Sequence, residues 1–135
     1  MQLFEEAKIP GAEVILADTG VTHVVKIGDT VRRPVRDFTE SVQSYLAHIR
    51  ANGFTQCPEP LGVDSQGREV LSFVEGEIPI KPLPEYIAND EVIIELAILQ
   101  RKLHDAAQDF QPGVDAIWGD IPGGNPDGVL PIFDK

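Results

Sequence analysis

The stretch VVKIGDTVRRPVR, residues 24–36, decides the fold expected for the N-terminal half of the chain. Two runs rich in β-branched residues flank Gly28, and a glycine can adopt the positive φ that a tight hairpin turn often needs. Pro34 cannot donate a ladder hydrogen bond, so the second strand must lie at a sheet edge or end near this residue. The stretch therefore predicts a β-hairpin. In a chain whose formal net charge is −11, it also gathers four basic residues: Lys26, Arg32, Arg33 and Arg36.

The regions on either side of this hairpin predict one more strand and a helix. GAEVILAD, residues 11–18, is a short apolar run rich in β-branched residues, which is typical of a strand. After the hairpin the spacing changes, and apolar residues fall at helical intervals on one face: Val42, Tyr45, Leu46 and Ile49. Asp37 or Thr39 can cap the start of this helix, and Asn52-Gly53 provides the expected stop.

The second half of the sequence predicts another hairpin, a connector and a long helix. LGVD and REVLSFVEG flank the turn SQG, and IPIKPLP then excludes both a central strand and a helix. Residues 90–110 keep helical spacing and begin with two acids, which the helix dipole favours. The expected fold is α+β, with an antiparallel sheet of about five strands, one inserted helix, a linker and one long helix. The expected parts are residues 1–78, residues 79–110, and a Pro/Gly-rich tail over residues 111–135.

Charge and composition exclude several classes of function. The 135 residues include 22 acids and 11 bases, so a general nucleic-acid or anionic-membrane binder is not expected and cationic ligands are the better electrostatic match. The single cysteine, Cys57, cannot form an internal disulfide, and the three histidines show no metal-ligand spacing with it. The N-terminus lacks signal-peptide features and no run has the length of a membrane span. We expect a cytoplasmic protein without a structural metal.

Three blocks of sequence resemble the kinase-like aminoglycoside phosphotransferase superfamily. They are GDTVRRP, then GF…PEPLGVDSQGREVLSFVEGEIP, then LQRKLHDAA, and together they lie within about residues 10–118. Several blocks in one order are more specific than any single motif. The resemblance implies a kinase-like N-terminal lobe followed by the start of a C-terminal lobe. It also implies ATP or GTP with magnesium as cofactor and a small hydroxylated compound as phosphoryl acceptor.

The same resemblance offers roles for the basic cluster. In this family a basic side chain on the third strand approaches the nucleotide phosphates, so either Arg32 or Arg33 would do so here, and Glu40 would orient it. Strand alternation puts the two arginines on opposite faces, which leaves the choice between them open. Phe73, Glu75 and Gly76 fall where the family has its adenine-binding hinge. The alternative is that the arginines form a solvated edge with surface ion pairs and that Phe73 belongs to the core.

A catalytic loop is the weakest part of the resemblance. WGDIPGGN supplies Asp120 and Asn125 at suitable spacing, and Asp134 follows as a candidate metal-binding acid. Trp118 occupies the position of the family's histidine, which favours a linker at this place. The sequence therefore predicts a truncated phosphotransferase-like protein that is inactive alone. The alternatives are a minimal active phosphotransferase and a non-enzymatic protein-binding module.

The long helix also implies a partner. In a complete protein of this family its apolar face would pack within the larger lobe, and large side chains left exposed cost roughly 1.5 to 3 kcal/mol each relative to burial. The helix must therefore fold back on the sheet or pair with another copy of the chain. We expect a homodimer through residues 90–110.

Overall fold

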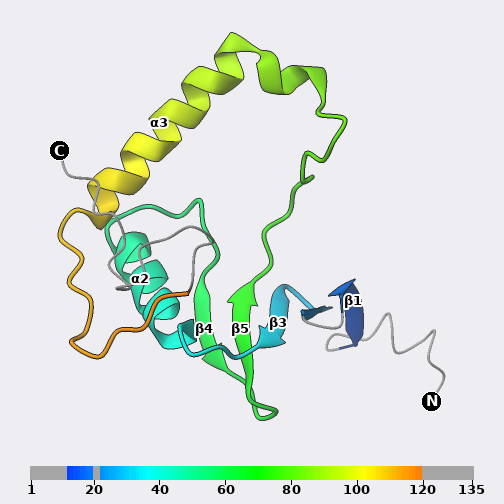
Figure 1. Cartoon of the computed structure of the whole chain (residues 1–135), viewed down its shortest axis with the longest axis vertical. Coiled ribbons are helices and arrows are strands. Elements are labelled where there is room, and N and C mark those ends of the chain that lie inside the picture. The colour runs from blue at the N-terminus through cyan, green and yellow to red at the C-terminus, as the bar shows by residue number, and fades with distance from the viewer. Residues whose placement is uncertain (1–11, 20–21, 120–135) are drawn as a thin grey trace.

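The computed structural model describes residues 12–19 and 22–119, which form one antiparallel sheet and two α-helices (Figure 1). The sheet order is β1-β2-β3-β5-β4. The helices are α2, Thr39–Ala51, and α3, Asp90–Ala107, preceded by the short 3₁₀ helix η1, Glu85–Ala88. The strands are β1 Glu13–Asp18, β2 His23–Ile27, β3 Thr30–Pro34, β4 Pro60–Val63 and β5 Arg68–Ser72. The predicted α+β class, five-stranded antiparallel sheet, inserted helix and long helix are confirmed.

The hairpin of residues 24–36 occupies the middle of the sheet. Strand β2 pairs with β3 through a turn in which Gly28 has φ +57°. Strand β3 also pairs with β5, in a register that places Arg33 opposite Glu69 and Pro34 opposite Arg68. Pro34 is thus the last residue of an interior strand. Of the two positions that the sequence allowed for it, the strand end is correct and the sheet edge is not.

Helix α2 begins at Thr39, between the two starts that a cap by Asp37 or by Thr39 would give. Its N-cap residue is Phe38, which offers no capping side chain, so the expected cap by Asp37 or Thr39 is wrong. The Thr39 hydroxyl instead accepts a hydrogen bond from the backbone N–H of Arg36, within the turn that leads into the helix. At the other end Gly53 has φ +92°, which is the left-handed conformation expected of a helix stop.

The core lies where α2 meets the C-terminal half of α3. Ile49, Phe54 and Ala106 are its buried residues, and Leu99 and Leu103 pack against them. The helix ends are also tied by polar contacts, since the Asn52 amide donates to the backbone carbonyl of Ala106 at 2.8 Å. Figure 1 shows that the N-terminal half of α3 extends away from the sheet, which it joins through a long linker. Within residues 12–19 and 22–119, no helix is long and apolar enough to span a membrane.

Candidate functional site

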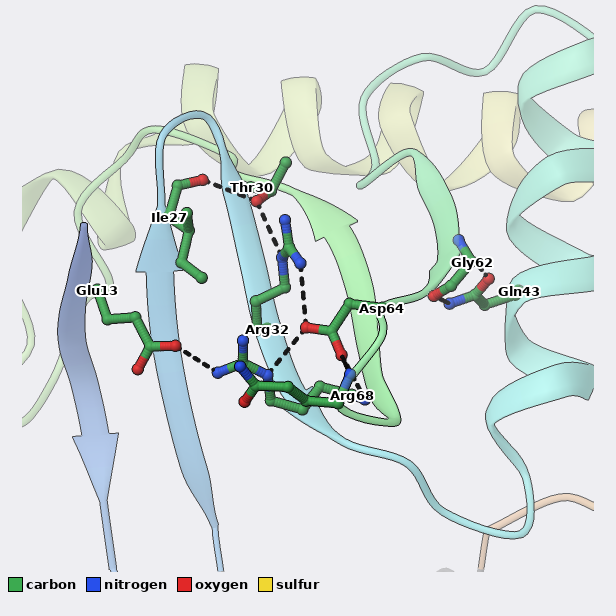
Figure 2. A network of polar contacts seen from close by, with 9 residues as sticks. Glu13, Ile27, Thr30, Arg32, Gln43, Gly62, Asp64 and Arg68 are labelled. Atoms are coloured by element: carbon green, nitrogen blue, oxygen red, sulfur yellow. Dashed lines mark hydrogen bonds and ion pairs between the residues drawn. The ribbon is translucent and has the colours of Figure 1, made fainter. Parts of the chain in front are cut away.

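Arg32 lies in a network of ion pairs on one face of the sheet (Figure 2). Its guanidinium donates to Asp64 Oδ2 at 3.0 Å and to Thr30 Oγ1 at 3.2 Å. Arg68 donates to the same Asp64 oxygen at 2.9 Å and to Glu13 Oε1 at 2.7 Å. The network therefore links β1, β3, β5 and the turn before β5, and it neutralises Arg32 with a carboxylate of the protein itself.

Asp64 is the centre of this network. Its Oδ1 accepts hydrogen bonds from the backbone N–H groups of Gln66 and Arg68, both at 2.9 Å. The Arg68 backbone bond is the main reason that the pKa of Asp64 falls from 3.8 to about 2, and the side chains of Arg68 and Arg32 lower the pKa further. Asp64 is therefore ionised at neutral pH and shapes the β4–β5 turn.

Arg33 points to the opposite face, as strand alternation predicts, and pairs with Glu69. The Glu69 side chain is only 1% exposed, and its other carboxylate oxygen lies 3.4 Å from the amide of Gln43 on α2. Gln43 also exchanges two hydrogen bonds with the backbone of Gly62, which docks α2 on β4 (Figure 2). Arg33 thus takes part in the attachment of α2 to the sheet.

The remaining residues of the expected nucleotide site are dispersed. The Lys26 ammonium lies over the Phe73 ring, 4.2 Å from the ring centroid, in a cation–π contact. Glu75 and Gly76 lie in the exposed linker that follows β5. Glu40 is exposed on the first turn of α2, whereas the carboxylate partners of Arg32 and Arg33 are Asp64 and Glu69. Two of the four basic residues that the sequence shows, Arg32 and Arg33, are therefore balanced by acids of the chain.

An aromatic cluster holds the segment after α3 against α2. The Phe110 ring lies edge-on to Tyr45, with centroids 5.2 Å apart, and Trp118 lies edge-on to both at 6.4 and 6.2 Å. The backbone N–H of Ile117 donates to Ser41 Oγ at 3.0 Å. Burial, and secondarily the nearby Cys57, raises the pKa of the Tyr45 hydroxyl. Residues 110–118, which we call the strap, are thus tied to α2 at both ends.

Between this strap and the first turns of α2 lies a hollow of about 330 Å³. We call it the acidic hollow, because its lining includes three acids and no basic side chain. Asp37 and Glu40 line it from the α2 side, and Asp115, Phe110 and Trp118 line it from the strap. Carboxylates beside aromatic faces form an environment that attracts a cation through both charge and ring quadrupole.

A second hollow of about 570 Å³ adjoins the first. The two share Asp37, Glu40 and Ser44, and the second is also lined by Gln43 and Val63. A ligand in either hollow can therefore reach Asp37 and Glu40. This arrangement suits an extended ligand that passes over the start of α2 better than a small enclosed substrate.

The three candidate catalytic residues, Asp120, Asn125 and Asp134, lie outside the described residues. In residues 12–19 and 22–119, no group of three or more His, Cys, Asp or Glu side chains is arranged to hold a metal ion. The binding of ATP or GTP with magnesium was inferred only through the family resemblance and stays a prediction.

Comparison with known proteins finds a relative of a different kind from the family that the resemblance implied. Over 115 residues the chain is 36% identical to a trifolitoxin immunity protein from Rhizobium leguminosarum bv. trifolii. The chain is similar to an immunity protein. The match covers 84% of this chain and 42% of the relative, so the chain spans less than half of the immunity protein's length. No family model and no solved structure matches the chain.

This similarity corrects the assignment made from sequence blocks. The relative is named for immunity to a toxin, so the phosphotransferase family and function predicted above are wrong. The physical reason is that an order of strands, helix and linker specifies a topology, and one topology serves many functions. The kinase-like part of the fold prediction likewise has no support from a solved structure.

Sequence reasoning missed the residues that organise the site. Asp64 and Glu69 are the carboxylates that balance the two arginines, and neither was singled out. Asp64 begins the turn DSQG, where an aspartate is expected to accept backbone hydrogen bonds, so its role was detectable. Asp115 joins Asp37 and Glu40 only through the tertiary fold, and no local pattern could have found it.

Proposed function

We propose that the chain confers immunity to a toxin by binding the toxin directly. The observation that carries this proposal is the 36% identity over 115 residues to a trifolitoxin immunity protein. Because the chain spans 42% of that relative, immunity by this chain alone belongs to the proposal. Direct binding requires only a complementary surface, and the acidic hollow is the best candidate for that surface.

The chemistry of the acidic hollow favours a basic side chain of the toxin as its occupant. A guanidinium or ammonium group can contact the carboxylates of Asp37, Glu40 and Asp115 while it also lies against the Trp118 ring. A cation over an aromatic face gains about 0.5–1 kcal/mol at exposed sites and about 2 kcal/mol when desolvated. The aromatic walls therefore add specificity for a cation that exposed acids alone would not supply.

The charge of the whole chain supports the same kind of partner. A formal net charge of −11 attracts cations from a distance and raises the rate of encounter with a basic ligand. Because salt screens such attraction over about 8 Å at physiological ionic strength, binding should weaken as salt concentration rises.

A protection assay tests the proposal. The chain is expressed in a trifolitoxin-sensitive strain, and survival is measured over a series of trifolitoxin concentrations. In parallel, calorimetry measures binding of trifolitoxin to the purified chain. Asp37→Asn combined with Glu40→Gln should weaken binding about tenfold or more and reduce protection, because both carboxylates face the hollow. The matched control is Glu59→Gln with Glu77→Gln, which removes the same charge at two exposed positions outside both hollows.

The results of these assays test the proposed immunity function and the proposed binding site separately. Sensitivity equal to that of cells without the chain, together with no measurable binding, would overturn immunity by this chain. Protection that survives Asp37→Asn with Glu40→Gln would retain immunity and reject the acidic hollow. Equal loss in the control variant would assign the effect to total charge instead of the hollow.

A further inference from the structure

Helix α3 carries an exposed stripe that the core does not use. Leu99 and Leu103 face α2, whereas Ile94 and Ile98 are 58% and 51% exposed. Ile94 and Ile98 are four residues apart, so they lie one above the other on a different face of the helix from Leu99 and Leu103. Two large apolar side chains thus stand side by side without a covering element in the described part of the chain.

This apolar pair is flanked by an acidic residue on its N-terminal side and a basic residue on its C-terminal side. Glu91 precedes Ile94 by three residues, and Arg101 follows Ile98 by three residues. The spacing of three, four and three is that of a coiled-coil seam, so all four side chains share one face. Glu91 and Arg101 are both exposed, and neither forms an ion pair among the described residues. Over residues 91–101 the seam is acidic at its start, apolar in the middle and basic at its end, and the acid Asp105 follows on the same face.

We propose that α3 pairs with α3 of a second copy of this chain in an antiparallel, two-fold symmetric dimer. Reversing one helix places Glu91 opposite the partner's Arg101 and Ile94 opposite the partner's Ile98, and the two-fold axis repeats both contacts. A parallel dimer would instead place Glu91 opposite Glu91 and Arg101 opposite Arg101, which like-charge repulsion disfavours. Charge complementarity therefore selects both the occupant of the seam and its orientation.

The dimer leaves the rest of the molecule as described. None of the four seam residues belongs to the α2–α3 core, so Leu99 and Leu103 keep their place against Ile49 and Phe54. The acidic hollow belongs to α2 and the strap, and the seam residues do not line it. Dimer formation is accordingly independent of the proposed immunity function.

Charge reversal gives the sharpest test. Glu91→Arg places arginine against arginine twice, and Arg101→Glu places glutamate against glutamate twice, so each variant should raise the dimer dissociation constant about tenfold or more. Mixing the two single variants creates only opposite-charge contacts, and a heterodimer should form at equal concentrations. Sedimentation equilibrium of the full chain should give twice 14.8 kDa for the wild type and for the mixture.

An apolar substitution with a matched control supports the charge test. Ile94→Asp should raise the dissociation constant about a hundredfold, because the seam loses a half-exposed isoleucine from each copy. Ile93→Asp alters a similarly exposed isoleucine, 52%, on a different helix face and should leave dimerisation unchanged. Circular dichroism confirms that both variants keep their helices. A monomeric wild type at high micromolar concentration, or failure of the two charge variants to pair on mixing, would overturn the antiparallel dimer.

Discussion

Replacing Arg33 by methionine should destabilise the protein strongly, because it leaves the buried carboxylate of Glu69 without its main partner. Glu69 is 1% exposed and is paired with Arg33 across neighbouring strands. Removing one member of a buried ion pair costs about 3–5 kcal/mol. The Arg33 side chain is 39% exposed, so water can enter the vacated space, and Gln43 keeps a contact with Glu69. We therefore expect a loss of about 2–3 kcal/mol in the free energy of unfolding, below the full buried-pair figure.

Urea unfolding at neutral pH measures this loss. Fluorescence of the single tryptophan, Trp118, follows the strap, and far-ultraviolet circular dichroism follows the helices. Coincident transitions by the two probes justify a two-state fit. Lys81→Met is the matched control, because it removes one positive charge from an exposed linker residue and should change stability by less than about 0.5 kcal/mol.

A double variant separates an unpaired charge from lost packing. Arg33→Met with Glu69→Met replaces the ion pair by two apolar side chains, and such replacements are often neutral or stabilising. The double variant should therefore be more stable than Arg33→Met alone. The reasoning is refuted if Arg33→Met loses less than about 1 kcal/mol, or if the second substitution adds to the loss.

Three further predictions concern other parts of the structure. Because the folded-state pKa of Asp64 is about 2 and its ordinary value is 3.8, its stabilising contribution is complete above about pH 4 and lost as pH falls through 2. The stability difference between wild type and Asp64→Asn, measured by urea midpoints, should shrink over that range; a constant difference would contradict this account. Ile49→Ala should cost about 2–5 kcal/mol in urea unfolding, since Ile49 is buried at the α2–α3 contact, and a loss below about 1 kcal/mol would place the core elsewhere. Gly53→Ala should lower the free energy of unfolding by about 1–2 kcal/mol through backbone strain alone, because φ is +92° and no atom lies within 4 Å of an added Cβ. Gly113→Ala, where the space is equally open and φ lies outside the left-handed region, should leave the melting temperature almost unchanged.

The sheet and helices could be predicted from sequence because their signals are local. Alternating β-branched runs, a glycine in each turn and apolar residues at helical spacing each lie within a few neighbouring residues. The cap of α2 was predicted wrongly because Thr39 Oγ1 bonds backward to the Arg36 N–H, so the helix starts after Phe38. The residue at which α2 starts therefore depends on how the preceding turn folds.

The candidate site was less predictable because its pairs are distant in sequence. Arg33 and Glu69 are 36 residues apart, and a glutamate in a strand usually faces solvent. Glu40 was expected to orient an arginine, and the structure places it in the acidic hollow instead. Arg32 and Asp64 are likewise 32 residues apart, so neither carboxylate partner of the two arginines could be seen in a local pattern.

The interior position of β3 has a consequence for synthesis. One edge of β3 pairs with β2 and the other pairs with β5. Because Pro34 pairs with Arg68, the ribosome must add 34 further residues after β3 is complete before the pairing with β5 can begin. At bacterial and eukaryotic elongation rates of roughly 5–20 residues per second this takes about 2–7 s. During that interval the nascent hairpin presents an unpaired row of N–H and C=O groups, which is a template for association between chains. Slowed elongation between these two strands would therefore lower the yield of native protein more than the same delay after Ser72.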